Sequence, residues 1–128
     1  MRSNSHSSVK GKNILLVDDD GIVRGLRAKI LGNLGHRITE ADSLSKARSL
    51  WAPGVFNLVI VDVKHGLREA LEFCEETKRI ANQLVALLTP YTAYVPANAC
   101  ADDVIHKEDG PAHFVREVQQ LLSAAPAR

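Results

Sequence analysis

The sequence has few of the features that mark secreted, membrane-spanning or nucleic-acid-binding proteins. Its two cysteines, Cys74 and Cys100, lie far apart and form no C-x-x-C pair, so neither a disulfide framework nor a zinc site is expected. The 16 Lys and Arg residues nearly balance the 15 Asp and Glu residues, so the overall charge attracts neither nucleic acid nor an anionic membrane. No apolar run is long enough to span a bilayer. We therefore expect a cytoplasmic protein with reduced thiols that binds neither nucleic acid directly nor a membrane.

Apolar residues are plentiful enough for one core. They make up 45% of the 128 residues, and two domains in a chain of this length would each be too small to be stable. Residues 1–11 are polar and rich in serine, which predicts a disordered leader, and residues 124–128 predict a frayed tail. We expect a single domain over residues 12–123.

Short apolar runs of the β type alternate with helical periodicity from Asn13 onward. The predicted strands are residues 13–17 (NILLV), 36–41 (HRITEA), 56–61 (FNLVIV), 83–88 (QLVALL) and 103–106 (DVIH). This alternation predicts an α/β fold in which a parallel sheet is covered by helices on both faces.

The 3.6-residue periodicity of amphipathic helices separates and follows these strands. The predicted helices cover residues 22–34, 44–51, 67–78 and 111–122. Ser43 is a suitable N-cap for the second helix, and Gly35 follows the first where a positive φ is favourable. A helix before the last strand should be short or distorted, because Pro90 and Pro96 bracket too few residues for more than about two turns.

Polar side chains follow four of the five predicted strands. They are Asp18, Asp19 and Asp20 after the first strand, Asp62 after the third, Thr89 after the fourth and Lys107 after the fifth. Because ligands of open parallel sheets bind beyond the carboxyl ends of the strands, we expect these side chains to lie together. Carboxylates from two strands make an oxygen-rich pocket for Mg²⁺, and a hydroxyl and an ammonium group could hold phosphate oxygens. This set of groups suits phosphoryl transfer.

The same residues, in the same order, resemble the receiver domains of bacterial two-component response regulators, the CheY-like superfamily. The resemblance runs from about Lys12 to Leu122. The segment VDDD resembles the acidic pair of the family, here Asp18 and Asp19, and NLVIVD resembles its phosphoacceptor strand, with Asp62 as the acceptor.

The later strands carry the rest of the resemblance. The segment ALLT would place the switch hydroxyl on Thr89, and ACADDVIHK resembles the family ending A-G-A-D-D-Y-I-x-K, with Lys107 as the invariant lysine. The resemblance implies a flavodoxin-like (βα)5 three-layer sandwich with the strand order 2-1-3-4-5.

A magnesium site is also implied by the resemblance. Its ligands would be Asp18, Asp19, Asp62 and the backbone carbonyl of Lys64. Asp20 is left without a role in this site, and we expect it to cap the helix that follows.

The implied function is a phosphorylation switch. Asp62 would accept a phosphoryl group from the phosphohistidine of a sensor histidine kinase or a phosphotransfer protein, with Mg²⁺ and Lys107 neutralising the developing charge. Thr89 and Lys107 would bind the new phosphoryl group, and an unknown downstream protein would read the resulting population shift. Beyond its own phosphorylation and dephosphorylation, no enzymatic activity is expected.

Several positions on the output side depart from the family pattern. The switch aromatic of the last strand is Val104, the glycine of A-G-A is Cys100, the proline after the lysine is Glu108, and the residue after the switch threonine is Pro90. The loop at residues 64–70 also lacks the usual proline, and its His65 is expected to face solvent. The resemblance therefore implies intact phosphorylation chemistry with an atypical output face.

Two other functions remain open. One is a pseudo-receiver, an interaction module of the same fold that is never phosphorylated. The other is a haloacid dehalogenase-type phosphatase, because VDDDGIV also fits its D-x-D-G-[TV] motif with Asp18 as nucleophile and Asp20 as general acid and base. The phosphatase reading gives Asp62 no role, and it needs an acidic pair after the lysine, whereas residues 102–103 precede Lys107.

Overall fold

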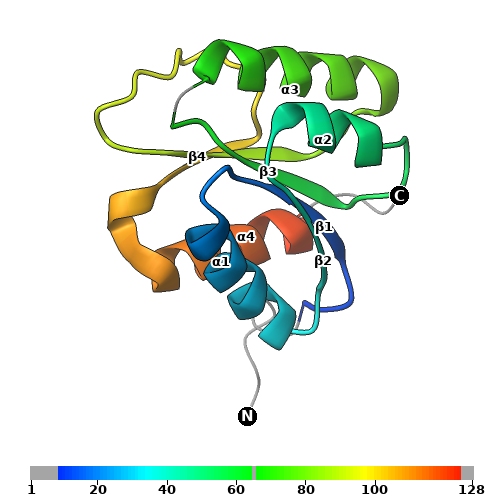
Figure 1. The fold of residues 1–128 in the computed structure, drawn as a ribbon, viewed down its shortest axis with the longest axis vertical. Helices are drawn as coiled ribbons and strands as arrows, with labels where there is room; N and C mark the ends of the chain where they lie inside the picture. The colour runs from blue at the N-terminus through cyan, green and yellow to red at the C-terminus, as the bar shows by residue number, and fades with distance from the viewer. Residues whose placement is uncertain (1–8, 65, 125–128) are drawn as a thin grey trace.

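A five-stranded parallel sheet forms the centre of the molecule (Figure 1). The computed structural model describes residues 9–64 and 66–124. The strands are β1 (Asn13–Val17), β2 (Arg37–Ala41), β3 (Leu58–Asp62), β4 (Val85–Thr89) and β5 (Asp103–His106). They lie in the order β2-β1-β3-β4-β5 with every neighbouring pair parallel, so the predicted sheet and strand order are confirmed.

Helices cover both faces of this sheet. They are α1 (Gly21–Asn33), α2 (Leu44–Leu50), α3 (Leu67–Ala81) and α4 (Gly110–Ala124). Figure 1 shows α2 and α3 on one face and α1 with α4 on the other. Because successive residues of a strand point to opposite faces, β1 sends Leu15 and Val17 into the core under α2 and α3, and Ile14 and Leu16 into the core under α1 and α4.

The ends of two helices follow local sequence signals. Asp20 caps α1, with its Oδ1 accepting hydrogen bonds from the backbone nitrogens of Ile22 and Val23 at 3.1 Å. Ser43 caps α2 by accepting from the backbone nitrogen of Lys46 at 3.1 Å. Gly35 follows α1 with a φ of 97°, the left-handed conformation that glycine adopts at low cost. The predicted caps at Asp20 and Ser43 and the glycine stop are confirmed.

The segment between β4 and β5, residues 90–102, contains two single turns in place of a helix. The carbonyl of Pro90 accepts from the nitrogen of Ala93 at 3.1 Å, and that of Pro96 accepts from the nitrogen of Ala99 at 3.0 Å. A helix cannot run through this segment, because proline disfavours helical backbone at the residue before it and donates no hydrogen bond. The 3₁₀-helix η2 (Lys107–Asp109) then joins β5 to α4.

The start of the described chain is tied to α4. The side-chain nitrogen of Gln119 donates to the carbonyl of Val9 at 2.9 Å, and its oxygen lies 2.7 Å from Nε2 of the buried His36. The backbone nitrogen of Lys12 donates to Nδ1 of His36 at 3.2 Å, so Nε2 carries the proton of the neutral ring.

The predicted leader and tail lie only partly within the described residues. Residues 9–11 lie against the domain, and α4 includes Ala124, which was expected to begin the tail. The expectations for residues 1–8, residues 125–128 and His65 fall outside the described residues. Within the described chain, no helix is long and apolar enough to cross a membrane.

Candidate functional site

The sheet brings the predicted acidic residues together at the carboxyl ends of its central strands. Val17 of β1 pairs with Val61 of β3, so Asp18 and Asp62 extend from neighbouring strands. The side chains of these two residues are 1% and 4% exposed, whereas that of Asp19 is 60% exposed. A cavity of about 120 Å³ opens over the three carboxylates.

Asp18 lies in an environment that disfavours its charge. Burial raises the pKa of its carboxyl group, and the neighbouring Asp62 raises this pKa further. The backbone hydrogen bond from Asp20 and the charge of Arg27 act in the opposite direction. Two carboxyl groups in one partly buried pocket require compensating positive charge to remain ionised.

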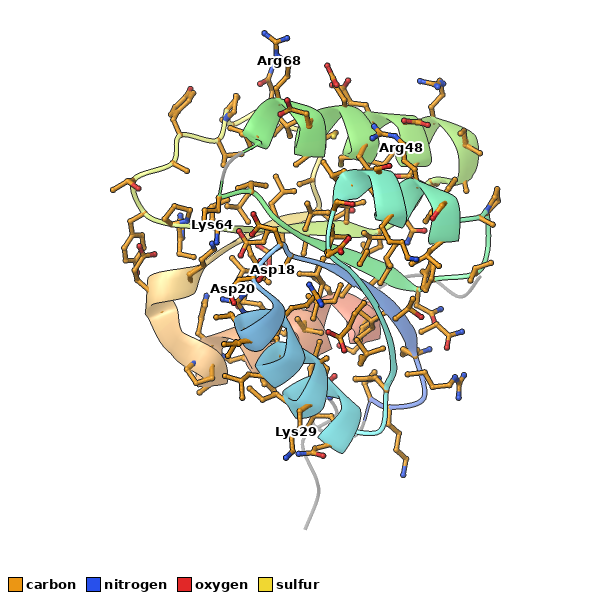
Figure 2. All side chains as sticks on the ribbon, viewed as in Figure 1. Asp18, Asp20, Lys29, Arg48, Lys64 and Arg68 are labelled. Atoms are coloured by element: carbon orange, nitrogen blue, oxygen red, sulfur yellow. The ribbon has the colours of Figure 1, made fainter. Side chains whose placement is uncertain are left out.

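Three cationic side chains from different elements supply that charge. The pairs are Lys107 Nζ with Asp62 Oδ1 at 2.7 Å, Arg27 Nη1 with Asp18 Oδ2 at 3.1 Å, and Lys64 Nζ with Asp19 Oδ1 at 3.3 Å. The hydrogen bond to Asp19 raises the pKa of Lys64. Figure 2 shows Lys64 close to the carboxylates at this edge of the sheet. Each carboxylate of the site is therefore already paired with a cation of the same chain.

Arg27 was missing from the predicted site. It lies on α1, and its Nη1 is also 3.6 Å from Oδ2 of Asp62. One sequence signal could have revealed it, because helical side chains tilt toward the N-terminus of their helix. Arg24 and Arg27 lie in the first two turns after the acidic triplet and point back toward it. Arg24 donates to the carbonyl of Asp18 at 2.7 Å.

Thr89 and Lys107 reach the same edge from β4 and from the start of η2. Asp62 pairs with Leu88 across the sheet, which places Thr89 one residue beyond the partner of Asp62. Thr89 is fully buried, and its hydroxyl has no hydrogen-bond partner among the described residues. A buried hydroxyl without a partner is costly, and such groups occur where a further polar atom is expected to bind.

Asp20 stands apart from this cluster. Its side chain caps α1, and the hydrogen bond from the backbone nitrogen of Val23 is the main reason that its pKa is lowered. A general acid needs a raised pKa to hold its proton near neutrality. These properties argue against the phosphatase reading of the acidic triplet.

The donor chemistry of the site fits a divalent cation such as Mg²⁺, which prefers carboxylate and carbonyl oxygens. The backbone nitrogen of Lys64 donates to Oδ1 of Asp62 at 3.0 Å, which holds the loop of the predicted carbonyl ligand next to Asp62. Among the described residues, no three acidic, histidine or cysteine side chains are arranged as a formed metal centre. Arg27 is paired with Asp18, and Lys64 is paired with Asp19.

Comparison with curated proteins gives a partial match. No protein-family model matches the chain. The chain is similar to PetR from Rhodobacter capsulatus, with 27% identity over 123 residues. The alignment covers 93% of the chain and 52% of PetR, so the chain spans about half the length of this relative.

Solved structures with the same fold include response regulators. TrrA from Thermotoga maritima, in complex with Mg²⁺ and BeF, is 27% identical with a TM-score of 0.76, covering 86% of this chain and 98% of TrrA. TrrA in complex with the histidine kinase ThkA is 28% identical with a TM-score of 0.74, covering 87% and 98%. The non-phosphorylated receiver domain of HemR from Leptospira biflexa has a TM-score of 0.81 at 20% identity, covering 91% and 98%, which shows a shared fold.

Proposed function

We propose that this chain is a receiver domain of the CheY-like superfamily and that it accepts a phosphoryl group on Asp62 as a switch in two-component signalling, as its similarity to the response regulator TrrA supports. One observation carries the proposal. The buried acceptor has a cation at 2.7 Å, Lys107 Nζ, and the neighbouring strand ends in Thr89, whose buried hydroxyl has no partner among the described residues. These are the two donors that a phosphoryl group on Asp62 would need.

The reaction follows from these positions. A carboxylate oxygen of Asp62 attacks the phosphorus of a phosphohistidine, the new O–P bond forms, and the N–P bond breaks to release the histidine of the donor. Two anionic groups must approach each other, so Lys107 lowers the barrier by neutralising charge at the acceptor. The transferred phosphoryl oxygens then accept hydrogen bonds from Lys107 and from the hydroxyl of Thr89.

Magnesium is part of this proposal. Asp18, Asp19, Asp62 and the backbone carbonyl of Lys64 would hold the ion, which supplies further charge neutralisation at the phosphoryl oxygens. The similarity to TrrA, which was crystallised with Mg²⁺ and BeF, supports this assignment.

The proposed phosphoryl donor is a sensor histidine kinase or a phosphotransfer protein. TrrA forms a complex with a histidine kinase, which supports a donor of this class. A groove of about 310 Å³ lies between α1 and α4, beside Lys107, and is lined by apolar residues that include Val23, Leu26 and Phe114. Ile22 and Leu26 are 80% and 59% exposed next to it. These side chains would suit a partner with an apolar helix face.

We also propose where the protein acts and which class of molecule reads its phosphorylated form. A cytoplasmic location agrees with the free thiols of Cys74 and Cys100. We assign the chain no turnover of an external substrate. The downstream partner is an unidentified protein that would read the phosphorylated form.

A pseudo-receiver is the second candidate. The observation that favours it is the pairing of Asp18, Asp19 and Asp62 with cations of the same chain, which leaves the acidic site neutralised without metal or phosphate. Such a module would bind partners through the same fold without phosphoryl transfer.

Intact-protein mass after incubation with Mg²⁺ and acetyl phosphate tests the proposal. We expect one phosphoryl adduct on the wild-type protein and none on Asp62→Asn. Asp20→Asn is the matched control, because asparagine caps a helix as well as aspartate does, and this variant should keep the adduct. An adduct that persists in Asp62→Asn would refute the assignment of the acceptor. No adduct on any protein, with acetyl phosphate or with a phosphorylated histidine donor, would favour the pseudo-receiver.

A further inference from the structure

We propose that Arg27 is a resident cation of the acidic pocket, which a divalent cation has to displace from Asp18 before it can bind. The inference rests on the proposed function, because it concerns the same pocket. It concerns the cation that competes for the carboxylates, whereas the proposed function concerns the residue that accepts the phosphoryl group.

The Oδ2 atoms of the two buried carboxylates, Asp18 and Asp62, face the same guanidinium group. Oδ1 of Asp18 accepts from the backbone nitrogen of Asp20 at 3.0 Å, and Oδ1 of Asp62 accepts from Lys107 at 2.7 Å. The second oxygens remain, and Nη1 of Arg27 lies 3.1 Å from Oδ2 of Asp18 and 3.6 Å from Oδ2 of Asp62. Arg27 therefore occupies the position that a metal ion bound to both Asp18 and Asp62 would take.

Contacts on the other side hold Arg27 in this position. Its guanidinium carbon lies 5.9 Å from the centre of the Phe114 ring, and its side chain is 17% exposed. Guanidinium groups are weakly hydrated and stack on aromatic faces, so burial between two carboxylates and a phenyl ring suits arginine. The groove of about 310 Å³ between α1 and α4 is lined by Arg27 and gives its side chain room to turn away.

Arg48 offers a direct comparison on the opposite face of the sheet. It also pairs with a carboxylate, Glu76 at 3.3 Å, and also lies over a phenyl ring, Phe73 at 5.5 Å. Its side chain is 41% exposed, and Figure 2 shows it beside α2 and α3, away from Asp18. Removal of Arg48 changes the net charge of the protein as removal of Arg27 does, without touching the acidic pocket.

Calorimetric titration of Mg²⁺ into the wild-type protein, Arg27→Met and Arg48→Met at fixed ionic strength tests the inference. We expect Arg27→Met to bind Mg²⁺ about tenfold more tightly than the wild type, because the competing positive charge 3.1 Å from Asp18 has been removed. Arg48→Met should match the wild type. Arg27→Lys should lie closer to the wild type, because it keeps the charge and loses the planar fork.

Thermal unfolding with and without Mg²⁺ is a second test, and it also shows whether each variant is folded. Without its cation, the pocket of Arg27→Met holds Asp18 and Asp62 with less compensation, so Tm should fall without metal. Addition of Mg²⁺ should raise Tm more in Arg27→Met than in the wild type, because a tighter ligand stabilises the native state more.

The outcomes separate this inference from the proposed function. Equal Mg²⁺ affinity in the wild type and Arg27→Met would overturn the inference, and an Asp62 adduct in the same proteins would leave the proposed function standing. Tighter Mg²⁺ binding by Arg27→Met without any adduct would support the inference and count against the phosphoryl switch. Absence of Mg²⁺ binding in all variants would overturn the inference and remove the metal from the proposed function.

Discussion

Carboxyl groups gather at both ends of the parallel sheet, and the two clusters are neutralised in different ways. At the carboxyl end, Asp18, Asp19 and Asp62 each pair with a cation. At the amino end, Asp103 begins β5 and meets Glu117 of α4, and neither forms an ion pair within the described chain. The pKa of Asp103 is raised to about 6, first by burial and then by the hydrogen bond and charge of Glu117.

The two clusters differ in whether they respond to a change of cation or to a change of pH. A cluster held by cations can exchange one cation for another without a change of protonation, which would suit the metal and phosphate binding that we propose for this pocket. A cluster that shares a proton responds to pH instead. Residues of the same type therefore have different electrostatic surroundings at the two ends of the sheet.

Removal of Lys107 should produce the largest change in the free energy of unfolding. In Lys107→Met the buried Asp62 loses its closest cation, and we expect the free energy of unfolding at pH 7 to fall by about 2 kcal/mol. Urea unfolding measures this loss. The same substitution in an Asp62→Asn background should cost much less, since no charge is left unpaired. Equal losses in the two backgrounds would mean that Lys107 acts by packing and not by charge.

The folded protein should become more stable near neutral pH when one of the two like charges at the amino end of the sheet is removed. The folded-state pKa of Asp103, about 6, lies above its ordinary value of 3.8. The folded protein therefore binds more protons between these values, and the contribution of Asp103 to stability falls as pH rises from about 4 to about 6. Glu117→Gln should weaken that fall and raise the free energy of unfolding by about 1 kcal/mol at pH 7.5, with little change at pH 4. A gain of the same size at both pH values would contradict this account.

Thr89 tests the uncharged part of the first cluster. Thr89→Val replaces a buried hydroxyl that has no partner in the described residues, so it should stabilise the unphosphorylated protein by about 1 kcal/mol in urea unfolding. Thr77→Val is the matched control, because the buried Thr77 hydroxyl donates to the carbonyls of Phe73 and Cys74 at 3.0 and 3.1 Å. This control should be neutral or destabilising. Stabilisation of similar size in both variants would indicate a general gain from apolar burial.

The smallest effect is expected for a surface ion pair that belongs to neither cluster. Arg48→Met removes the pair with Glu76, in which both side chains are about two-fifths exposed (41% and 42%). Exposed pairs contribute little, so the free energy of unfolding should change by less than about 1 kcal/mol. A larger loss would show that exposure alone does not separate this pair from those of the acidic pocket.

The fold and most of the site could be predicted because they depend on short-range signals. Buried parallel strands appear as continuous apolar runs, and their polar endings converge because the strands are parallel. The convergence of Asp62, Thr89 and Lys107 was predicted in this way, and the structure places them together. The caps at Asp20 and Ser43 could also be predicted, since a cap depends on one side chain and the backbone next to it.

The missed features depend on side-chain reach and on irregular backbone. Periodicity places Arg27 on a helix face but does not tell how far its long side chain extends across the pocket. Asp103 and Glu117 meet only through the docking of α4 on β5. Cys100 lies in the irregular segment at residues 90–102, and the fold brings it against Cys74, where burial raises the pKa of the Cys74 thiol and contact with Cys100 raises it further.

The hydrogen bond between Gln119 and Val9 has a consequence for the order in which the domain is completed during synthesis. The two residues are 110 positions apart, and a ribosome releases the N-terminal side of the chain first. The first strands can pair while the chain is still growing, but the carbonyl of Val9 and Nε2 of His36 gain Gln119 as a partner only after α4 has emerged. A nascent chain that stops before Gln119 would therefore leave part of the apolar sheet face under α4 open to chaperones and proteases.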